Sequence, residues 1–504
     1  MAADDRDQAA LDALARGEPA LVWRTQVADT ETPVAAALKL IRPGRGDYLL
    51  ESVEGGAVRG RYSLLGLAPD LMFRARGDKA EVNRDWATDR DAFAPLADDA
   101  LTAMRKLVTS CRMAVPKGLP NALACLVGYF AYETIGLVEK LPRPPANPLD
   151  LPDMLFARPT MILIFDRLAD QLFMVAPLWP ETPGTPEAKL ADAIERIDAH
   201  AAMLGGPLPP RSHDLSDAAA LSLTPQLAPG RYAEMVLKAK DYIAAGDIFQ
   251  VVLAQRFTVP FPLPPIDLYR ALRRINPSPF LYFLDLPGFA LIGSSPEILV
   301  RARDGEVTIR PIAGTRPRGK TAIEDAANRD SLLADPKERA EHLMLLDLGR
   351  NDVGRVAVAG TVEVTDSYTV EHYSHVMHIV SNVVGRLDPA KDALDALFAG
   401  FPAGTVSGAP KVRACEIIAE LEPETRGAYA GGVGYFSPDG SMDSCIVLRT
   451  AVVKDGMMHV QAGAGIVADS DPAYEQRECE AKAGALIAAA KEALIRAGEP
   501  GFGQ

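Results

Sequence analysis

Short strand-like runs separated by tight turns fill the C-terminal half of the chain, and no other feature of the sequence constrains the fold as strongly. Residues 289–301 and 306–312 are two such runs, on either side of Asp304 and Gly305, a pair typical of hairpin turns. Further runs are residues 249–257, 373–384, 432–438, 444–453 and 458–466. Strands joined by tight turns pair antiparallel, because parallel neighbours need a long crossover. The pattern therefore predicts antiparallel sheets and argues against a doubly wound parallel sheet.

Helical periodicity marks the segments around these runs. In the C-terminal half it covers residues 231–245, 328–348, 410–421 and 472–497. The N-terminal part has strand-like runs at residues 47–51, 62–67 and 158–165 and helical patterns at residues 98–110 and 186–204. The mixture indicates an α+β protein.

A stretch rich in proline, serine and glycine, residues 205–230, shows no sustained periodicity. A chain of 504 residues is also long enough for several domains. We predict an N-terminal α+β region of residues 1–205, a linker or long surface excursion of residues 206–229, and a C-terminal region of residues 230–504.

The charge balance limits the partners of the protein. A formal net charge of −14 argues against binding to nucleic acid or to an anionic membrane. The acidic N-terminus lacks the apolar segment of a signal peptide, and the longest apolar stretches, residues 122–132 and 161–165, are too short to span a bilayer. The five cysteines are widely spaced without a CxxC motif, which is typical of buried reduced thiols. We therefore expect a cytoplasmic protein. Because the whole chain is acidic, a site for an anionic substrate would need its own local positive charge.

Two pairs of glutamates have the spacing that places both side chains on one helix face. Glu338 and Glu341 form the first pair, and Glu475 and Glu478 form the second. Carboxylates from two helices could converge on Mg²⁺, which prefers oxygen ligands. The same spacing is common on solvated helix faces, so it leaves both interpretations open.

Other polar features lie within or beside the predicted strands. Arg449 interrupts an apolar run, where a cation is costly unless a core carboxylate or a bound anion pairs with it. The glycine-rich QAGAGIV segment could bring backbone amides close to an anion, or form a plain turn. The segment PIAGTRPRG, residues 311–319, could hold a small ligand or be a surface loop. Histidines 372, 375 and 378 on one strand would not share a face, which argues against zinc and leaves a single histidine as acid or base.

Taken together, these segments resemble the chorismate-utilising enzymes, and most closely the anthranilate synthase component I family. The motifs that carry the resemblance between residues 49 and 497 are LLES (49–52), GRYS (60–63), FQVV (249–252), NPSPF (276–280), GSSPE (293–297), PIAGTRPRG (311–319), EHLMLLDLGRND (341–352), SGAPK (407–411), GGVGYF (431–436) and QAGAGIV (461–467). The resemblance implies large antiparallel β-sheets that form a sandwich core with flanking helices. It also implies that residues 230–504 bind chorismate.

The resemblance assigns roles to the candidate residues. Glu341 and Glu478 match the magnesium ligands, with Glu338 and Glu475 in support. The residues that match substrate binders are Gly314, Thr315, Tyr429, Arg449, Gly463, Ala464, Gly465 and Lys482. Magnesium, arginine, lysine and oriented amides would then form one cationic pocket in an acidic protein.

The implied reaction is the Mg²⁺-dependent amination of chorismate by ammonia, followed by loss of pyruvate to give anthranilate, the first step of tryptophan biosynthesis. Glu297 matches the acid that protonates the leaving hydroxyl, and His378 matches the histidine of the elimination step. Glu338, Gln250 and Thr315 are the further catalytic residues that the family pattern implies.

Two positions distinguish members of the family. Gln250 stands where water-using relatives carry a lysine base, and Ala313 stands where aminodeoxychorismate synthases typically carry a lysine nucleophile. Both favour anthranilate synthase, with aminodeoxychorismate synthase component I as the alternative. A silent regulatory subunit is a further alternative, which the retained catalytic residues argue against.

The N-terminal motifs resemble the site for L-tryptophan, the feedback inhibitor of the family. Glu51 and Ser52 would hold its amino group, and Pro279, Phe280 and Leu281 would lie near its ring, although the same residues also suit ordinary strand packing. The chain shows no glutaminase motif. The resemblance therefore implies a glutamine amidotransferase subunit, anthranilate synthase component II, as the source of ammonia, with free ammonia as a substitute.

Overall fold

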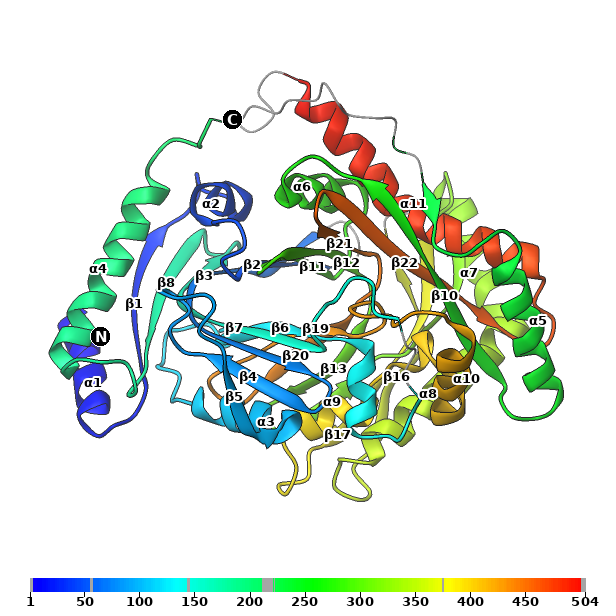
Figure 1. The fold of residues 1–504 in the computed structure, drawn as a ribbon, viewed down its shortest axis with the longest axis horizontal. Helices are drawn as coiled ribbons and strands as arrows, with labels where there is room; N and C mark the ends of the chain where they lie inside the picture. Colours follow the sequence, from blue (N-terminus) through cyan, green and yellow to red (C-terminus); the bar gives the residue numbers. More distant parts are fainter. Residues whose placement is uncertain are drawn as a thin grey trace.

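Antiparallel sheets flanked by helices form the protein (Figure 1), as the turn-separated runs predicted. The computed structural model describes residues 3–54, 58–142, 146–210, 221, 223–373 and 376–499. Every pairing between named strands in these ranges is antiparallel, and most successive strands are joined by short connections.

The strands form two facing layers. In the first layer, neighbouring strands follow the order β1 (Ala20–Val27), β8 (Gln171–Leu178), β7 (Met154–Asp166), β3 (Val58–Arg76), β2 (Asp47–Glu54), β11 (Phe280–Leu286), β12 (Phe289–Ser295), β21 (Thr450–Lys454), β22 (Met457–Ile466) and β10 (Gln250–Pro260). In the second, the order is β6 (Leu126–Phe130), β19 (Gly432–Phe436), β20 (Met442–Ile446), β13 (Ile298–Arg303), β14 (Glu306–Ile309), β17 (Val376–Arg386) and β16 (Glu363–His372), with β15 (Ile312–Pro317) also on β17. The layers join at β7, which pairs with both β3 and β6. Short strands β4 (Lys79–Asn83), β5 (Ala94–Asp99), β9 (Thr224–Pro225) and β18 (Gly408–Ala409) extend the edges.

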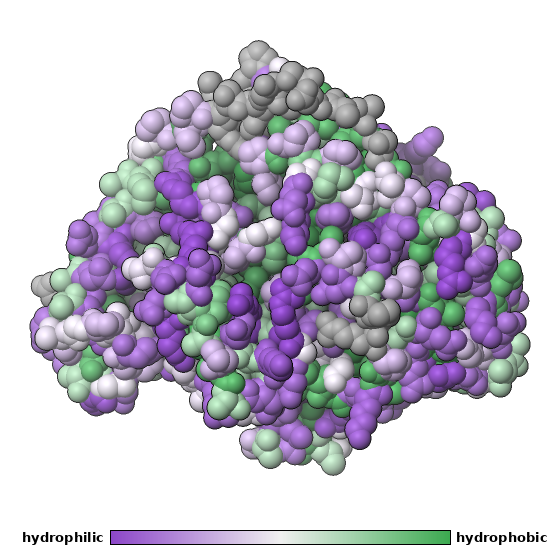
Figure 2. All heavy atoms as spheres, in the orientation of Figure 1, coloured by the Kyte–Doolittle hydropathy of each residue, from purple (hydrophilic) through white to green (hydrophobic). Residues whose placement is uncertain are grey.

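Apolar side chains fill the space between the layers. Strand β7 is buried at nearly every position, because both of its faces are covered. Aromatic rings are the largest side chains that are fully buried, and the rings of Phe130 and Phe156 lie 4.8 Å apart. Hydrophilic side chains run across much of the face shown in Figure 2, with smaller apolar patches between them.

Helices cover the outer faces of both layers. On the first layer, α11 (Pro472–Ala497) packs against β22, α5 (Arg231–Ala244) and α6 (Pro265–Ile275), while α4 (Pro186–Leu204) covers β8. On the second, α8 (Pro336–Gly354) packs against β15, β17 and α9 (Ala393–Gly400). The remaining helices are α1 (Ala3–Ala15), α2 (Pro33–Leu40), α3 (Ala100–Ser110), α7 (Ala322–Ala334), α10 (Lys411–Leu421), η1 (Tyr132–Leu137) and η2 (Gly404–Val406). The two predicted glutamate pairs therefore come from helices on different layers.

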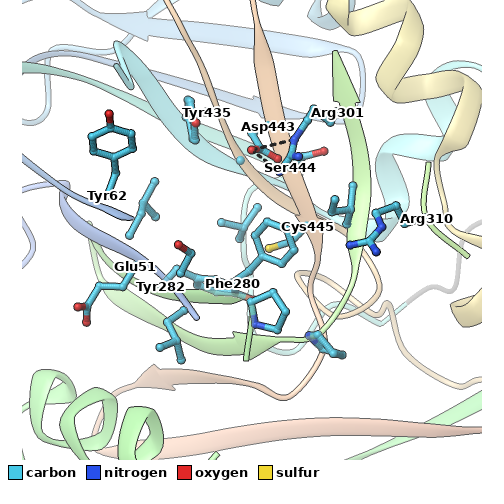
Figure 3. Close-up of a pocket in the computed structure, with 18 of the residues that line it drawn as sticks. Glu51, Tyr62, Phe280, Tyr282, Arg301, Arg310, Tyr435, Asp443, Ser444 and Cys445 are labelled. Carbon is cyan, nitrogen blue, oxygen red and sulfur yellow. Dashed lines mark hydrogen bonds and ion pairs between the residues drawn. The ribbon is translucent and has the colours of Figure 1, made fainter. Parts of the chain in front are cut away.

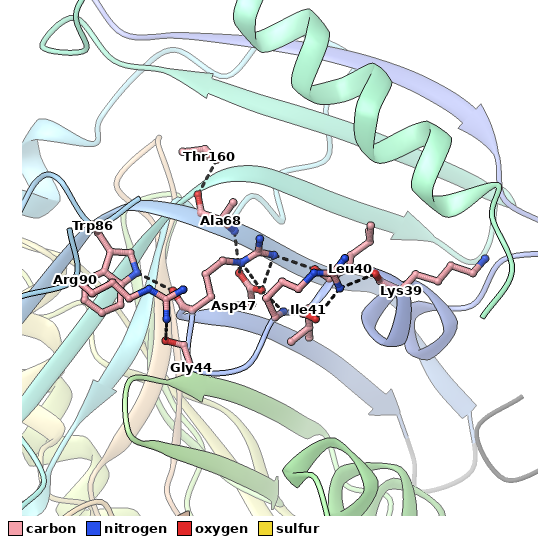
Figure 4. A network of polar contacts seen from close by, with 11 residues as sticks. Lys39, Leu40, Ile41, Gly44, Asp47, Ala68, Trp86, Arg90 and Thr160 are labelled. Carbon is pink, nitrogen blue, oxygen red and sulfur yellow. Dashed lines mark hydrogen bonds and ion pairs between the residues drawn. The ribbon is translucent and has the colours of Figure 1, made fainter. Parts of the chain in front are cut away.

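A buried carboxylate anchors the start of β2. Asp47 is fully buried and accepts hydrogen bonds from the backbone amides of Arg42 at 2.9 Å and Ala68 at 2.8 Å (Figure 4). The side chain of Arg45 binds the same carboxylate and also donates to the carbonyl of Leu40. These contacts fix the loop that leads into β2, the strand that carries two of the predicted effector residues.

Three elements predicted as continuous are broken. The run at residues 289–301 splits into β12 and β13, because the chain crosses between layers there. The run at residues 444–453 splits into β20 and β21 at Arg449, whose φ of 47° takes it out of the strand conformation. The helical segment at residues 328–348 splits at Asp335, since Pro336 starts a new helix. Each break therefore results either from the local backbone conformation or from a crossing of the chain between the layers.

The histidines do not share one strand. His372 ends β16 and His378 lies on β17, while residue 375 falls outside the described residues. The prediction that one strand carries all three was therefore wrong for His372.

The N-terminal and C-terminal regions share their sheets, because β2 pairs with β11 and β6 pairs with β19. Much of the predicted linker, residues 211–220 and 222, lies outside the described residues, and β9 at its end pairs with β10. The predicted domain boundaries stay predictions. All five cysteines are buried and free, as expected. Among the described helices, none has both the length and the apolar character of a membrane span.

Candidate active site

The glutamate pairs of α8 and α11 lie within electrostatic reach of one another. Burial raises the pKa of the Glu341 carboxyl, and the charges of Glu338 and Glu478 raise it further. The Gln250 side chain opposes this with a hydrogen bond, since its amide nitrogen is 3.4 Å from a Glu341 oxygen. Burial and the charge of Glu478 also raise the pKa of Glu475, which is 6% exposed. The structure thus places Glu478 of α11 close enough to Glu341 of α8 for their charges to interact.

These carboxylates suit a divalent cation that takes few protein ligands. Glu478 pairs with Lys482 at 2.7 Å, and Glu338 pairs with Arg316 at 3.0 Å. Within the described ranges, no group of three or more histidine, cysteine or acidic side chains is placed to hold a metal ion. Mg²⁺ is commonly held by one or two carboxylates, with water and substrate oxygens completing its shell. The raised pKa values of Glu341 and Glu475 fit such an ion, because its charge would favour their ionised forms.

Arg449 has no counter-ion in the part of the chain that the structure describes. It lies between β20 and β21, directly before the first residue of β21. Its side chain makes no hydrogen bond or ion pair with any described residue. Burial lowers the pKa of its guanidinium, and no carboxylate offsets this. A cation with this desolvation cost and no protein partner is suited to an external anion. Of the two partners considered for Arg449, the structure therefore favours a bound anion.

The glycine-rich segment is part of β22 rather than a turn. Residues 463–465 pair with β10 on one edge, while β21 pairs only with residues 457–460 on the other. One edge of the glycine segment is therefore without a strand partner in the described structure. A Cβ at Gly463 would lie 2.9 Å from the Tyr429 hydroxyl, so glycine is needed for this close approach. Lys482 donates to the Gly463 carbonyl at 2.9 Å, which joins lysine, tyrosine and glycines in one place.

Glu297 is the carboxyl best suited to donate a proton at neutral pH. It is 7% exposed and lies where the chain crosses from β12 to β13. The hydroxyl of Thr405 is 3.1 Å from each carboxylate oxygen. Burial raises the pKa of the Glu297 carboxyl to about 8, and the Thr405 hydrogen bond lowers it only in part. The carboxyl is therefore largely protonated at pH 7.

His378 is held as a neutral imidazole. Its Nδ1 is 2.9 Å from the Gly314 carbonyl and 3.2 Å from the Thr315 hydroxyl. Because a carbonyl only accepts, Nδ1 carries the proton and Nε2 is left as the basic nitrogen. Burial lowers the pKa of the imidazole to about 4, which keeps it neutral at pH 7. Tyr373 packs edge-on against the ring, with centroids 5.3 Å apart.

A cavity of about 760 Å³ lies between the layers beside this site, and all five predicted effector residues line it (Figure 3). Ser52, Pro279, Phe280 and Leu281 contribute to its wall. The Glu51 carboxylate points away from Phe280 and Tyr282, as Figure 3 shows.

The Glu51 carboxylate already has several protein partners. It accepts hydrogen bonds from Tyr269 at 2.6 Å and from two nitrogens of Arg273, each at 2.9 Å, and it pairs with Arg167. These groups lower its pKa although burial raises it. An effector amino group would have to compete with these partners for Glu51.

The cavity and the candidate active site share a wall. Pro296 and Ile298 line the cavity, and Glu297 between them does not. Tyr373 lines the cavity and also contacts His378. Sequence reasoning missed both Tyr373 and Thr405, because neither lies in a spacing pattern that indicates a function.

Comparisons with known proteins show the family of the chain. A family model described as chorismate binding enzyme matches residues 49–488. The chain is 50% identical to anthranilate synthase component 1 of Cereibacter sphaeroides over 488 residues, which cover 97% of each chain. It is 46% identical to the protein of that name from Thermus thermophilus over 470 residues, which cover 93% of this chain and 97% of that protein. The crystal structure of anthranilate synthase component I from Streptococcus pneumoniae TIGR4 matches with a TM-score of 0.75 at 36% identity, over 85% of this chain and 92% of the other.

These similarities extend over nearly the whole chain, and they include every segment that contributes to the site. The antiparallel architecture is consistent with them. The chain therefore belongs to the chorismate binding enzyme family, among the anthranilate synthase component 1 proteins, as an enzyme that acts on chorismate.

Proposed function

We propose that this chain is the chorismate-aminating component of an anthranilate synthase, which uses Mg²⁺ and ammonia to convert chorismate to anthranilate and pyruvate. The observation that carries the proposal is the half-buried Arg449, which has no counter-ion among the described residues and lies near His378, whose pKa it lowers. Its charge suits a carboxylate of the substrate. The curated relatives with this printed name support the same reaction.

Each end of a small dicarboxylate has its own binding groups. Arg449, Lys482 and the amides of residues 463–465 would hold the pyruvyl carboxylate, and Tyr429 would close the side of this cradle. Mg²⁺ held by Glu341 and Glu478 would bind the ring carboxylate and stabilise negative charge that develops there. The substrate dianion would thus be neutralised at both ends within an acidic protein.

The amination needs a nucleophile and an acid. Ammonia would add at C2 of the ring while the C4 hydroxyl leaves as water, with the proton supplied by Glu297. Gln250 lies beside Glu341 and has an amide in place of a basic amine, so it can hydrogen-bond to a nucleophile but cannot deprotonate water. This arrangement favours ammonia over water.

The elimination needs a base. The Nε2 atom of His378 would take the proton from C2 as the C3–O bond breaks, and the ring becomes aromatic as pyruvate forms. The neutral imidazole, fixed through Nδ1 by Gly314, supports this role.

Two further features complete the proposal. Ammonia would come from a glutamine amidotransferase partner, as the words "component 1" in the names of the relatives suggest. L-tryptophan would bind in the 760 Å³ cavity, next to Ser52 and Phe280, and inhibit the enzyme. The cavity volume is in the range of small-molecule sites.

The experiment is an assay with chorismate, Mg²⁺ and ammonium, with and without L-tryptophan. The proposal expects equal amounts of anthranilate and pyruvate, and none after removal of Mg²⁺. An aminated product that keeps its enolpyruvyl group would instead indicate aminodeoxychorismate synthase component I. Absence of any amination would contradict the proposal.

A further inference from the structure

The Glu297 carboxyl has one side-chain hydrogen-bond partner in the described structure, and it is a hydroxyl. Thr405 Oγ1 lies 3.1 Å from Oε1 and 3.1 Å from Oε2, so it is shared evenly by the two oxygens. Thr405 belongs to the short turn η2, more than a hundred residues along the chain from Glu297. No sequence motif joins these two positions.

The turn that carries Thr405 is held from several directions. The Val406 carbonyl accepts a hydrogen bond from Arg426 at 2.7 Å, and the Ser407 hydroxyl donates to the Ala403 carbonyl at 2.8 Å. A Cβ on Gly404 would lie 2.3 Å from a methyl carbon of Leu348 on α8, so the turn sits directly against that helix. The threonine hydroxyl is therefore presented from a fixed backbone.

Arg426 connects this turn with the rest of the site. Its guanidinium is fully enclosed, binds Glu422 at 2.6 Å and donates to the Val252 carbonyl of β10 at 2.7 Å. Its charge also lies over the ring of Tyr429, 5.6 Å from the centroid. One arginine thus ties the Thr405 turn to the strand of Gln250 and to the candidate substrate cradle.

We propose that Thr405 is a positioning residue that holds the Glu297 carboxyl in the orientation for proton donation. The inference rests on the proposed role of Glu297 as the acid. When one carboxyl oxygen carries the proton, the Thr405 hydroxyl donates to the other oxygen, which leaves the O–H free to point at the substrate. The shared hydroxyl also limits rotation of the carboxyl group, because both oxygens lie at the same distance from it.

The hydrogen bond has a signature in the pH profile. A hydroxyl that donates to a carboxylate favours the ionised form, so its loss raises the pKa of Glu297 above its present value of about 8. The titratable group that faces Glu297 from a neighbouring element is Tyr373, which stays protonated at this pH because burial raises its pKa. Removal of the hydroxyl should therefore lower the rate and yet extend activity to higher pH, a combination that a loss of structure would not produce.

The experiment compares Thr405→Val, which keeps the branched shape without the hydroxyl, with Thr405→Ser, which keeps the hydroxyl. Both are assayed with ammonium across a range of pH. At each pH the rate of the variant is divided by the rate of the wild type, so that the titration of ammonium cancels. For Thr405→Val we expect kcat to fall roughly 10- to 100-fold, with KM for chorismate nearly unchanged. Its basic limb should move up by about one pH unit. Thr405→Ser should restore most of the rate and the original limb.

Glu297→Gln separates this inference from the proposed function. In the Glu297→Gln background, Thr405→Val should lower kcat little further, because there is no acid left to position. If Glu297→Gln keeps full activity, the acid role itself is wrong. If Glu297→Gln is inactive but Thr405→Val leaves both kcat and the basic limb unchanged, only the positioning role is overturned. Additive losses in the double variant would also overturn it.

Discussion

The ring of Tyr373 meets the imidazole of His378 edge to face, with the ring centroids 5.3 Å apart. The Tyr373 hydroxyl donates to Glu371 at 3.1 Å, and Glu371 pairs with Arg310, which lines the 760 Å³ cavity together with Tyr373 itself. A single side chain therefore touches both the candidate base and the candidate effector cavity. Such a contact is a physical path by which occupancy of the cavity could change catalysis.

Replacement of Tyr373 tests this path. Tyr373→Leu removes the ring contact with His378, and we expect L-tryptophan to inhibit the variant roughly 5- to 100-fold less strongly. Tyr373→Phe keeps the ring, and L-tryptophan should inhibit this variant nearly as strongly as it inhibits the wild type. Inhibition curves at matched chorismate saturation give the measurement, and equal inhibition of the leucine variant and the wild type would rule out this path.

Arg449 should show opposite effects on activity and on stability. Arg449→Met removes the proposed partner of the substrate carboxylate, and kcat/KM should fall about 100-fold or more. The melting temperature of the free enzyme should rise slightly, because the variant no longer buries a cation that lacks a counter-ion among the described residues. Thermal unfolding without ligands gives the second measurement. A clearly lower melting temperature would mean that Arg449 has a structural partner.

Glu341 should couple metal binding to pH and stability. Its folded-state pKa is raised by burial and by the neighbouring glutamates, so it destabilises the metal-free protein as pH rises through that value. Glu341→Gln should raise the melting temperature of the metal-free protein at neutral pH, with a smaller effect at acid pH where the glutamate is protonated. The same variant should bind Mg²⁺ at least about 100-fold more weakly. Calorimetric titration with Mg²⁺ checks this, and unchanged affinity would remove Glu341 from the ligand set.

His378 should separate the two chemical steps. In His378→Asn the amination would continue while the elimination slows roughly 100- to 10,000-fold, so the aminated intermediate should accumulate. Chromatography of the product mixture measures this directly.

The same histidine predicts a change in acid stability. Burial lowers its folded-state pKa to about 4, so the unfolded chain binds the extra proton between its ordinary value of 6.5 and about pH 4. Stability is thus lost as pH falls through this window, and His378→Asn should reduce that loss. Urea titrations at several pH values provide the test, and parallel curves for variant and wild type would contradict it.

The long periodic helices could be predicted from the sequence nearly to the residue. The segments 186–204 and 472–497 match α4 and α11 because a helix of this length is specified by its own repeating apolar face. The hairpin turn at Asp304 and Gly305 is likewise a local signal, and it does join two strands. Local patterns of this kind also placed both glutamate pairs on helix faces.

The breaks that form the site could not be predicted in this way. Glu297 lies where the chain changes layers and Arg449 adopts a left-handed conformation, and neither event is encoded in a residue pattern that a short window can detect. The approach of α8 to α11 depends on strand pairings between distant segments. Thr405 reaches Glu297 only through such long-range packing, so its role has no sequence signal.

The segment of residues 296–298 limits how inhibition by the effector can be lost by mutation. Pro296 and Ile298 line the cavity and Glu297 between them does not, so a substitution there that reshapes the cavity also displaces the acid. Ser52 and Leu281 belong to strands that carry no candidate catalytic group. We therefore expect substitutions in those two strands to relieve inhibition while the enzyme stays active. Substitutions in the wall shared by the cavity and the active site should relieve inhibition only with a loss of activity.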